Sequence, residues 1–421
     1  MEEKRVLSFI HISDIHFRKE SGDPYDIDNE LRKAMLTDLE YKAKKELVNV
    51  CGVLVCGDLA FSGQESEFSV AKNFLNDVTK IFGISLKDVF CVAGNHDVDQ
   101  SIARNSRILE CIQDDLVLID KNEPDYLDAE IRKIQNDQFI RGVLYEPLSA
   151  YNKCVKEMAS DYSIEEPTWQ SLMMLSGKYT LAIYGMNSVL VSNHKDHLDK
   201  DGNKLIDAER KMVINRKQIP DYCENVIYLS LCHHPPECWN NDNLEAFMDS
   251  RVRIQLYGHK HIQHIEVNDK RVRIGSGALH PERGWEWNPR YNWLEIWIEE
   301  DTLFVKIYPR VFEDTNGIFI SDVKSCDMDK EYRLIEMQLS DNANEKAKRK
   351  SEILEQREVR STDIITKEII YRFSILSDSD KKRLLRSFQK IDYTIEQDLY
   401  ILLQQLRNNN LEMDFLNAMK K

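Results

Sequence analysis

The sequence lacks the features that mark membrane and secreted proteins. No run of eighteen or more apolar residues occurs among its 421 residues, so no transmembrane helix is expected. The first ten residues, MEEKRVLSFI, do not have the pattern of a signal peptide. The nine cysteines include no CxxC pair, which favours buried, reduced thiols over disulfides or a zinc knuckle. Together these absences predict a cytoplasmic protein without membrane contact.

An excess of positive charge is also missing. The chain has 57 Lys and Arg against 72 Asp and Glu, a formal net charge of −15. Because sequence-independent binding to nucleic acid depends on a basic surface, this balance argues against a passive DNA-coating protein. The composition, 42% hydrophobic and 31% charged, is that of a globular chain. If such a protein acts on phosphates, it needs a local source of positive charge.

Short apolar runs alternate with amphipathic stretches over the first hundred residues. Continuous apolar strands between helices are typical of a sheet covered on both faces, which predicts an α/β fold. This alternation ends at about residue 100, and the pattern of residues 100 to 178 predicts a helical insertion. Strand patterns return after it. In the first hundred residues we expect strands at 6–12, 53–56 and 89–93, with helices at 29–50 and 65–81.

Three domains are expected along the chain. They are a catalytic domain at 1–325, a charged helical linker at 326–360 and a small helical module at 361–421. The last module carries no catalytic motif, but its helices have apolar stripes that need a partner surface. It is therefore a candidate for self-association or for binding a protein partner.

Polar residues that can bind metals follow five of the predicted strands, at the edge where open α/β sheets place their sites. Mixtures of Asp and His suit Zn²⁺, Mn²⁺ or Fe, and in a D-x-H or H-x-H segment both side chains can face one site. Enough donors are present for two metals that share a carboxylate. The residues are Asp14, His16, Asp58, Asn95, His96, Asp97, His233, His234, His259 and His261.

These five blocks resemble the signature of the calcineurin-like metallophosphoesterases, which is D-x-H, G-D, G-N-H-[D/E], H and G-H-x-H in that order. The resemblance covers residues 5–310. It implies an α/β fold of the α+β four-layer type, in which a sandwich of two sheets is flanked by helices. It also implies two divalent metal ions, with Mn favoured over Fe or Zn. One metal would be held by Asp14, His16, Asp58 and His261, and Asp58 would bridge to a second metal held by Asn95, His233 and His259.

The resemblance further implies hydrolysis by a metal-activated hydroxide that attacks phosphorus. His96 is the candidate to protonate the leaving oxygen, with Asp97 orienting its ring. The choice of His233 over His234 as the ligand rests on the likeness of His233-His234-Pro235-Pro236 to members with an HHPP block.

The substrate class is inferred from the same blocks. After Gly57-Asp58 the chain reads LAFSG, without the arginine by which the Ser/Thr protein phosphatases of the family grip the phosphate. The HHPP block and the run from Ser62 to Phe68 look more like the phosphodiesterase branch, so a nucleotide or nucleic-acid phosphodiester is expected. One alternative is a nuclease resembling SbcD, possessing C-terminal helices that recruit it as a bacterial effector. Another is a non-catalytic, metal-binding regulatory or adaptor protein.

Overall fold

The computed structural model describes residues 5–18, 27–119, 124–159, 168–196, 212–240, 242–279, 288–339, 369, 372–373, 376–388, 391 and 399–419. The chain divides into two compact units, residues 1–339 and 340–421. Within the described ranges, no helix has both the length and the apolar character needed to cross a membrane.

The first sheet carries the amino-terminal strands. Its order is β12-β11-β10-β1-β2-β3, and β13 pairs with β11. The pairs β1–β2 and β2–β3 are parallel, whereas β10 and the later strands pair antiparallel. The strands are β1 (Leu7–Ile12), β2 (Val50–Val55), β3 (Val89–Cys91), β10 (Arg290–Glu299), β11 (Thr302–Glu313), β12 (Ile318–Ser321) and β13 (Arg333–Gln338).

The second sheet is also mixed and has the order β4-β5-β6-β7-β9-β8. Its central strands β5, β6, β7 and β9 run parallel, and β4 and β8 pair antiparallel at the two edges. The strands are β4 (Trp169–Met174), β5 (Thr180–Gly185), β6 (Val226–Cys232), β7 (Val252–Tyr257), β8 (Gln263–Val267) and β9 (Val272–Ser276). Two mixed sheets with helices outside them confirm the predicted α/β class.

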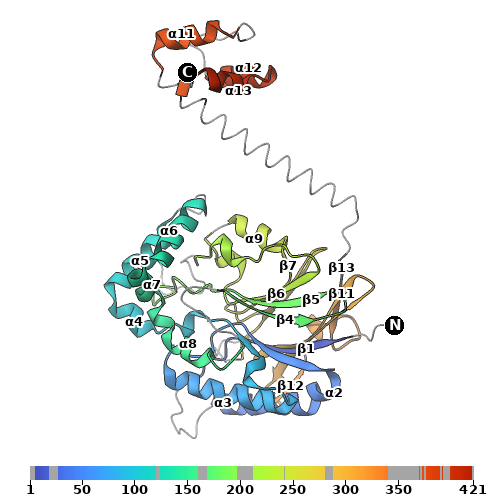
Figure 1. Cartoon of the computed structure of the whole chain (residues 1–421). Coiled ribbons are helices and arrows are strands. Elements are labelled where there is room, and N and C mark those ends of the chain that lie inside the picture. Colours follow the sequence, from blue (N-terminus) through green and yellow to red (C-terminus); the bar gives the residue numbers. More distant parts are fainter. Residues whose placement is uncertain are drawn as a thin grey trace. The chain divides into compact units, whose positions relative to one another are not determined.

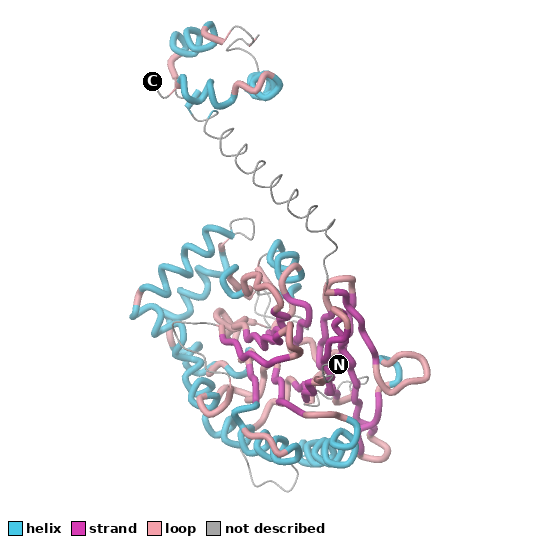
Figure 2. Tube along the Cα trace, turned by 45° about the vertical axis from the view of Figure 1, so that its right-hand side comes forward, coloured by secondary structure: helices cyan, strands magenta, loops and turns pink. Residues whose placement is uncertain are grey.

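Helices lie on the outside of the two sheets, as the tube trace in Figure 2 shows. One group, at the blue end of the chain in Figure 1, lies beside the first sheet: α1 (Ile27–Asp38), α2 (Lys44–Glu46) and α3 (Glu65–Phe82). A second group forms the expected insertion: α4 (Gln100–Asn105), α5 (Arg107–Leu118), α6 (Pro124–Asn136), α7 (Gln138–Tyr145) and α8 (Ser149–Val155). In addition, α9 (Asp242–Asp249) packs near β7.

Apolar side chains from both sheets and from the helices beside the first sheet form one core. Phe9, Leu54, Leu75 and Leu229 are all buried in it. A smaller cluster that includes Trp239 lies on the other side of the second sheet, under α9. All nine cysteines are free, but only five are buried as expected, and Cys111 and Cys223 are exposed.

Two segments differ from the expected secondary structure. Residues 333–338, assigned in the sequence to a helical linker, form β13, because Ile335 and Met337 on alternate positions are buried against the first sheet. The end of the expected helical insertion is strand β4, whose Trp169 lies in the core. The charged stretch 341–360, expected to be helical, lies outside the described residues.

The second unit contains a small helical core of its own. Its described helices are α11 (Asp378–Arg386), α12 (Leu399–Asn408) and α13 (Glu412–Ala418). Phe373, Leu402, Leu406 and Phe415 are buried among them. Helices α11, α12 and α13 lie within residues 361–421, where the sequence predicted a small helical module.

Candidate metal centre

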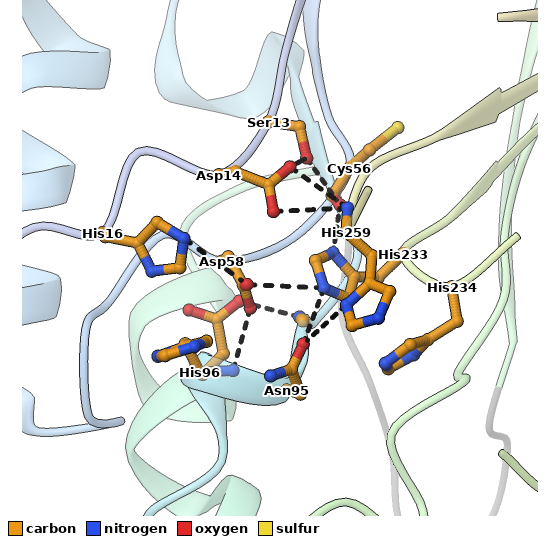
Figure 3. Close-up of polar contacts among 12 residues, drawn as sticks. Ser13, Asp14, His16, Cys56, Asp58, Asn95, His96, His233, His234 and His259 are labelled. Carbon is orange, nitrogen blue, oxygen red and sulfur yellow. Dashed lines mark hydrogen bonds and ion pairs between the residues drawn. The ribbon is translucent and has the colours of Figure 1, made fainter. Parts of the chain in front are cut away.

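The carboxyl ends of five strands meet at one place and carry the residues singled out in the sequence. Strands β1, β2 and β3 of the first sheet lead into Asp14, Asp58 and Asn95, and strands β6 and β7 of the second lead into His233 and His259. Figure 3 shows these side chains pointing toward one another, together with His16 and His96. Parallel strands of each sheet end at one edge, and these edges of the two sheets meet. Residues more than two hundred positions apart, such as Asp14 and His259, therefore become neighbours.

Most of these residues have a left-handed backbone. The φ angle is 53° at Asp14, His16 and Asp58, 67° at His259 and 55° at His261. Non-glycine residues adopt this conformation uncommonly, and such residues cluster at functional sites. Each sharp turn lets the chain leave its strand while the side chain stays over the sheet edge. Local strain at five positions in one cluster is the mark of a site rather than of ordinary loops.

Four of the predicted ligands form a compact group. One ligand atom each of Asp14, His16, Asp58 and His261 lies within 4.8 Å of the others. Nε2 of His261 is 3.2 Å from Oδ1 of Asp14, and Nε2 of His16 is 3.7 Å from Oδ2 of Asp58. Ser13 and the backbone N–H of His259 hold the carboxylate of Asp14.

A second group adjoins the first through Asp58. Nδ1 of His233 donates to the carbonyl of Cys56 at 2.8 Å, which leaves Nε2 facing inward. That Nε2 is 2.9 Å from Oδ1 of Asn95 and 3.4 Å from Oδ2 of Asp58. Nδ1 of His259 is 3.2 Å from the same Asn95 oxygen. A ligand histidine whose other nitrogen donates to a carbonyl is the usual arrangement at metal sites.

His234 also belongs to this neighbourhood. Ligand atoms of His233, His234 and His259 lie within 4.8 Å of one another, and the rings of His234 and His259 are 4.4 Å apart between centroids. Nδ1 of His234 is 2.9 Å from Oγ of Ser188. Of the two adjacent histidines, His233 directs its nitrogen at Asp58. The assignment of His233 as the ligand stays a prediction.

The electrostatics of the first group fit a cation, whereas in the second group burial is outweighed by Asp58, which raises the pKa of His233 to about 9. Burial tends to raise the pKa of Asp58, but His233 and His96 outweigh it and hold that pKa well below its usual range. Likewise, burial raises and His261 lowers the pKa of Asp14, with a net decrease. Burial lowers the pKa of His16 to about 3. Ionised carboxylates beside a neutral imidazole form a donor set suited to Mn²⁺, Fe or Zn²⁺.

The expected pairing of Asp97 with His96 is wrong. Nδ1 of His96 instead donates to the carbonyl of Phe61 at 2.8 Å. The Asp97 carboxylate accepts the backbone N–H groups of Ala60 and Gly94, each at 2.8 Å. Asp97 therefore fixes the loops after β2 and β3, and the Phe61 carbonyl sets the ring of His96. With Nδ1 bound in this way, Nε2 of His96 is the nitrogen available to a substrate.

Residues outside the sequence motifs complete the surroundings. The loop after β5 brings Ser188 to His234 and continues to the helical insertion. There Gln113 of α5 donates to the carbonyls of Leu190 and Ser192 at 3.2 and 3.3 Å. No signal in the sequence marks Ser188, because its contact depends on how the loop crosses the sheet edge. The insertion is thereby connected to the centre through one loop.

The chain is similar to a known family and to known proteins. The sequence model of the calcineurin-like phosphoesterase family matches residues 7–263. Over 262 residues the chain is 25% identical to the uncharacterized metallophosphoesterase-like protein YydB of Bacillus subtilis (strain 168), covering 61% of this chain and 49% of YydB. The chain thus spans about half the length of this curated relative.

The chain is also similar to solved structures at low sequence identity. A conserved protein of Streptococcus pneumoniae TIGR4, described as a predicted phosphoesterase, has 11% identity and a TM-score of 0.27, with 79% of this chain and 98% of that chain covered. Vps29 of Chaetomium thermophilum has 9% identity and a TM-score of 0.33, with 80% and 97% covered.

Proposed function

Because the chain belongs to the calcineurin-like phosphoesterase family, we propose that it is a metallophosphoesterase that acts on phosphate esters, and more specifically a dimetal phosphodiesterase of the HHPP-type branch. Its proposed substrate is a phosphodiester in a nucleotide or nucleic acid. The proposed cofactors are two divalent ions, Mn²⁺ in preference to Fe or Zn²⁺.

One observation carries this proposal. The carboxylates of Asp14 and Asp58 and the imidazoles of His16 and His261 offer ligand atoms within 4.8 Å of one another. Asp58 also faces His233, 3.4 Å away, so one carboxylate lies between the two groups of donors. We assign Asp14, His16, Asp58 and His261 to one metal, and Asp58, Asn95, His233 and His259 to the other. Two metals so placed lower the pKa of bound water and stabilise charge on a phosphate.

The chain's own residues complete the chemistry. Nε2 of His96 is free to hold a proton at the leaving oxygen, because Nδ1 is committed to Phe61. Its backbone N–H also donates to Oδ1 of Asp58 at 2.8 Å, so His96 and the bridging carboxylate are positioned together. Asp97 acts indirectly, by holding the backbone that carries His96.

The test is hydrolysis of bis-p-nitrophenyl phosphate with and without Mn²⁺. Asp58→Ala and His96→Ala should each abolish Mn²⁺-dependent turnover. His264→Ala is the matched control, because His264 is an exposed histidine on β8. Activity retained in both site variants would refute the proposal. A screen against cyclic nucleotides, single- and double-stranded DNA, RNA and phosphomonoesters then separates a phosphodiesterase for small substrates from a nuclease.

We also propose a cytoplasmic location and a role for the C-terminal helices in self-association or partner binding. Ile401 and Met413 are 38% and 49% exposed on α12 and α13, which supports an external contact. Gel filtration of the chain ended near residue 340 tests this proposal. An unchanged assembly state together with unchanged partner pull-downs would contradict it.

A further inference from the structure

The chain segments that follow β1 and β2 stay paired beyond the ends of the strands. The backbone N–H of His16 donates to the carbonyl of Asp58, and that of Phe17 donates to Leu59 at 2.7 Å. The N–H of Phe61 donates back to Phe17 at 3.0 Å, and Phe17 and Ala60 form an isolated parallel bridge. This parallel register carries the chain past both metal-binding turns and brings the residue after Phe17 beside Phe61.

That residue is Arg18, whose guanidinium lies over the ring of Phe61. Its Cζ is 3.9 Å from the ring centroid, within the range of a cation–π contact. Arg18 is exposed and Phe61 is half-buried. A guanidinium over an aromatic ring keeps N–H donors that can bind an oxyanion.

The Phe61 ring stands directly beside the candidate metal centre. Its centroid is 5.7 Å from the ring of His96 and 6.4 Å from that of His16. Arg18 is therefore one aromatic ring away from the proposed acid and from a proposed metal ligand. The long arginine side chain brings a permanent positive charge to a chain whose net charge is −15.

We propose that Arg18 is a substrate-binding residue that contacts an anionic oxygen of the phosphate group at the metal centre, with Phe61 as its platform. The inference rests on the proposed function and assigns the residue that grips its substrate. Arg18 meets the need for local positive charge from the β1 turn, although the five residues directly after Asp58, LAFSG, include no arginine.

The platform is itself held in place by a buried carboxylate. Glu67, at the start of α3, is 6% exposed and accepts the backbone N–H of Ser62 at 2.9 Å and its hydroxyl at 2.8 Å. It also accepts the N–H of Gln64 at 3.1 Å. These hydrogen bonds fix the loop immediately after Phe61. They therefore help to position both the Phe61 ring that contacts Arg18 and the Phe61 carbonyl that accepts from His96.

The test uses the full chain loaded with Mn²⁺ and compares Arg18→Met, Arg18→Lys and wild type. Methionine keeps an unbranched stem that can cover the ring but removes the charge, and lysine restores the charge without the planar fork. Arg251→Met is the matched control, because Arg251 also lies over an aromatic ring, 5.1 Å from the centroid of Phe247, but directly precedes β7 at the end opposite His259. The measurements are KM and kcat for bis-p-nitrophenyl phosphate, and binding of inorganic phosphate and of Mn²⁺ by calorimetry.

Loss of a charge-assisted hydrogen bond should raise KM and the dissociation constant of phosphate about 10- to 100-fold in Arg18→Met. We expect kcat to change much less, Mn²⁺ affinity to stay unchanged and Arg18→Lys to recover part of the loss. Unchanged KM and phosphate binding in Arg18→Met would overturn the proposal, as would a loss of Mn²⁺ affinity in both Arg18 variants. If wild type hydrolyses no phosphodiester, the proposed function fails, but phosphate binding still tests Arg18 independently.

Discussion

Gly94 offers a way to displace Asp58 without changing any ligand. A Cβ atom at Gly94 would lie 2.1 Å from Oδ1 of Asp58, 2.4 Å from its backbone nitrogen and 2.7 Å from its Cγ. Such atoms need at least about 3 Å, so in Gly94→Ala the carboxylate and its backbone must retreat by about 1 Å. Gly94 has a φ of −101°, which alanine can adopt, so the effect of the methyl group is steric.

The displacement would reach both proposed metal sites. It would break the 2.8 Å bond from the N–H of His96 to Asp58 and change the separation of Asp58 from His16 and His233. Because a misplacement of about 1 Å can cost roughly 100-fold in rate, we expect kcat/KM to fall by at least that factor. Crowding of the interior should also lower the free energy of unfolding by about 1–3 kcal/mol.

The assay combines Mn²⁺ binding by calorimetry, hydrolysis of bis-p-nitrophenyl phosphate and urea unfolding. Gly142→Ala on α7 is the matched control, since nothing lies within 4 Å of the added methyl group. The control should gain about 0.5–1 kcal/mol of stability, because alanine favours a helix over glycine, and keep full activity. Wild-type Mn²⁺ affinity and kcat/KM in Gly94→Ala would refute the reasoning that Asp58 must stay in its observed position.

Three further predictions concern stability. Burial lowers the pKa of His11 to about 3. Below about pH 6.5 the unfolded chain therefore binds a proton at His11 that the folded chain does not bind. The free energy of unfolding then falls by about 1.4 kcal/mol for each pH unit. In urea unfolding at pH 7 and 5.5, His11→Gln should lack this loss, and an identical pH slope in both proteins would count against it. Asp38→Ala should cost about 3–5 kcal/mol of unfolding free energy, because it leaves buried Arg310 without the carboxylate now 2.6 Å away. Asp38→Leu with Arg310→Met should recover only part of this loss, because the buried Tyr291 hydroxyl also donates to Asp38. A loss below about 1 kcal/mol in Asp38→Ala contradicts this prediction. Mn²⁺ at 100 times its dissociation constant should add about 2.7 kcal/mol per site, and a melting temperature insensitive to Mn²⁺ and EDTA would argue against binding to the folded state.

The positions of the central strands could be predicted because buried parallel strands must be apolar on both faces. The apolar run Val226–Cys232 is such a strand. The polar residues that directly follow it, His233 and His234, therefore lie at its carboxyl end. The same reasoning, applied to the sequence alone, places Asp14, Asp58 and His259 at one edge of the fold. Strand pattern places each of these residues after a strand, and the resemblance to the family signature groups them into one candidate centre.

Edge strands and backbone contacts could not be predicted in this way. Strand β13 buries only Ile335 and Met337, and its polar residues Arg333, Glu336 and Gln338 gave it the composition of a linker. Asp97 bonds to the backbone N–H groups of Ala60 and Gly94, which have no sequence signature. Arg18 contacts Phe61 only because the parallel pairing of β1 and β2 continues beyond the ends of both strands. Neither segment shows this continued pairing in its own sequence.

The division of the proposed ligands between the two sheets has a mechanical consequence. Asp14, Asp58 and Asn95 follow strands of one sheet, whereas His233 and His259 follow strands of the other. Ions coordinated by both sets would act as cross-links across the seam of the sandwich. Any sliding of one sheet over the other would then change the distances between the ligands of the two sheets. Bound ions would limit that motion, because they would link the two layers that surround the core.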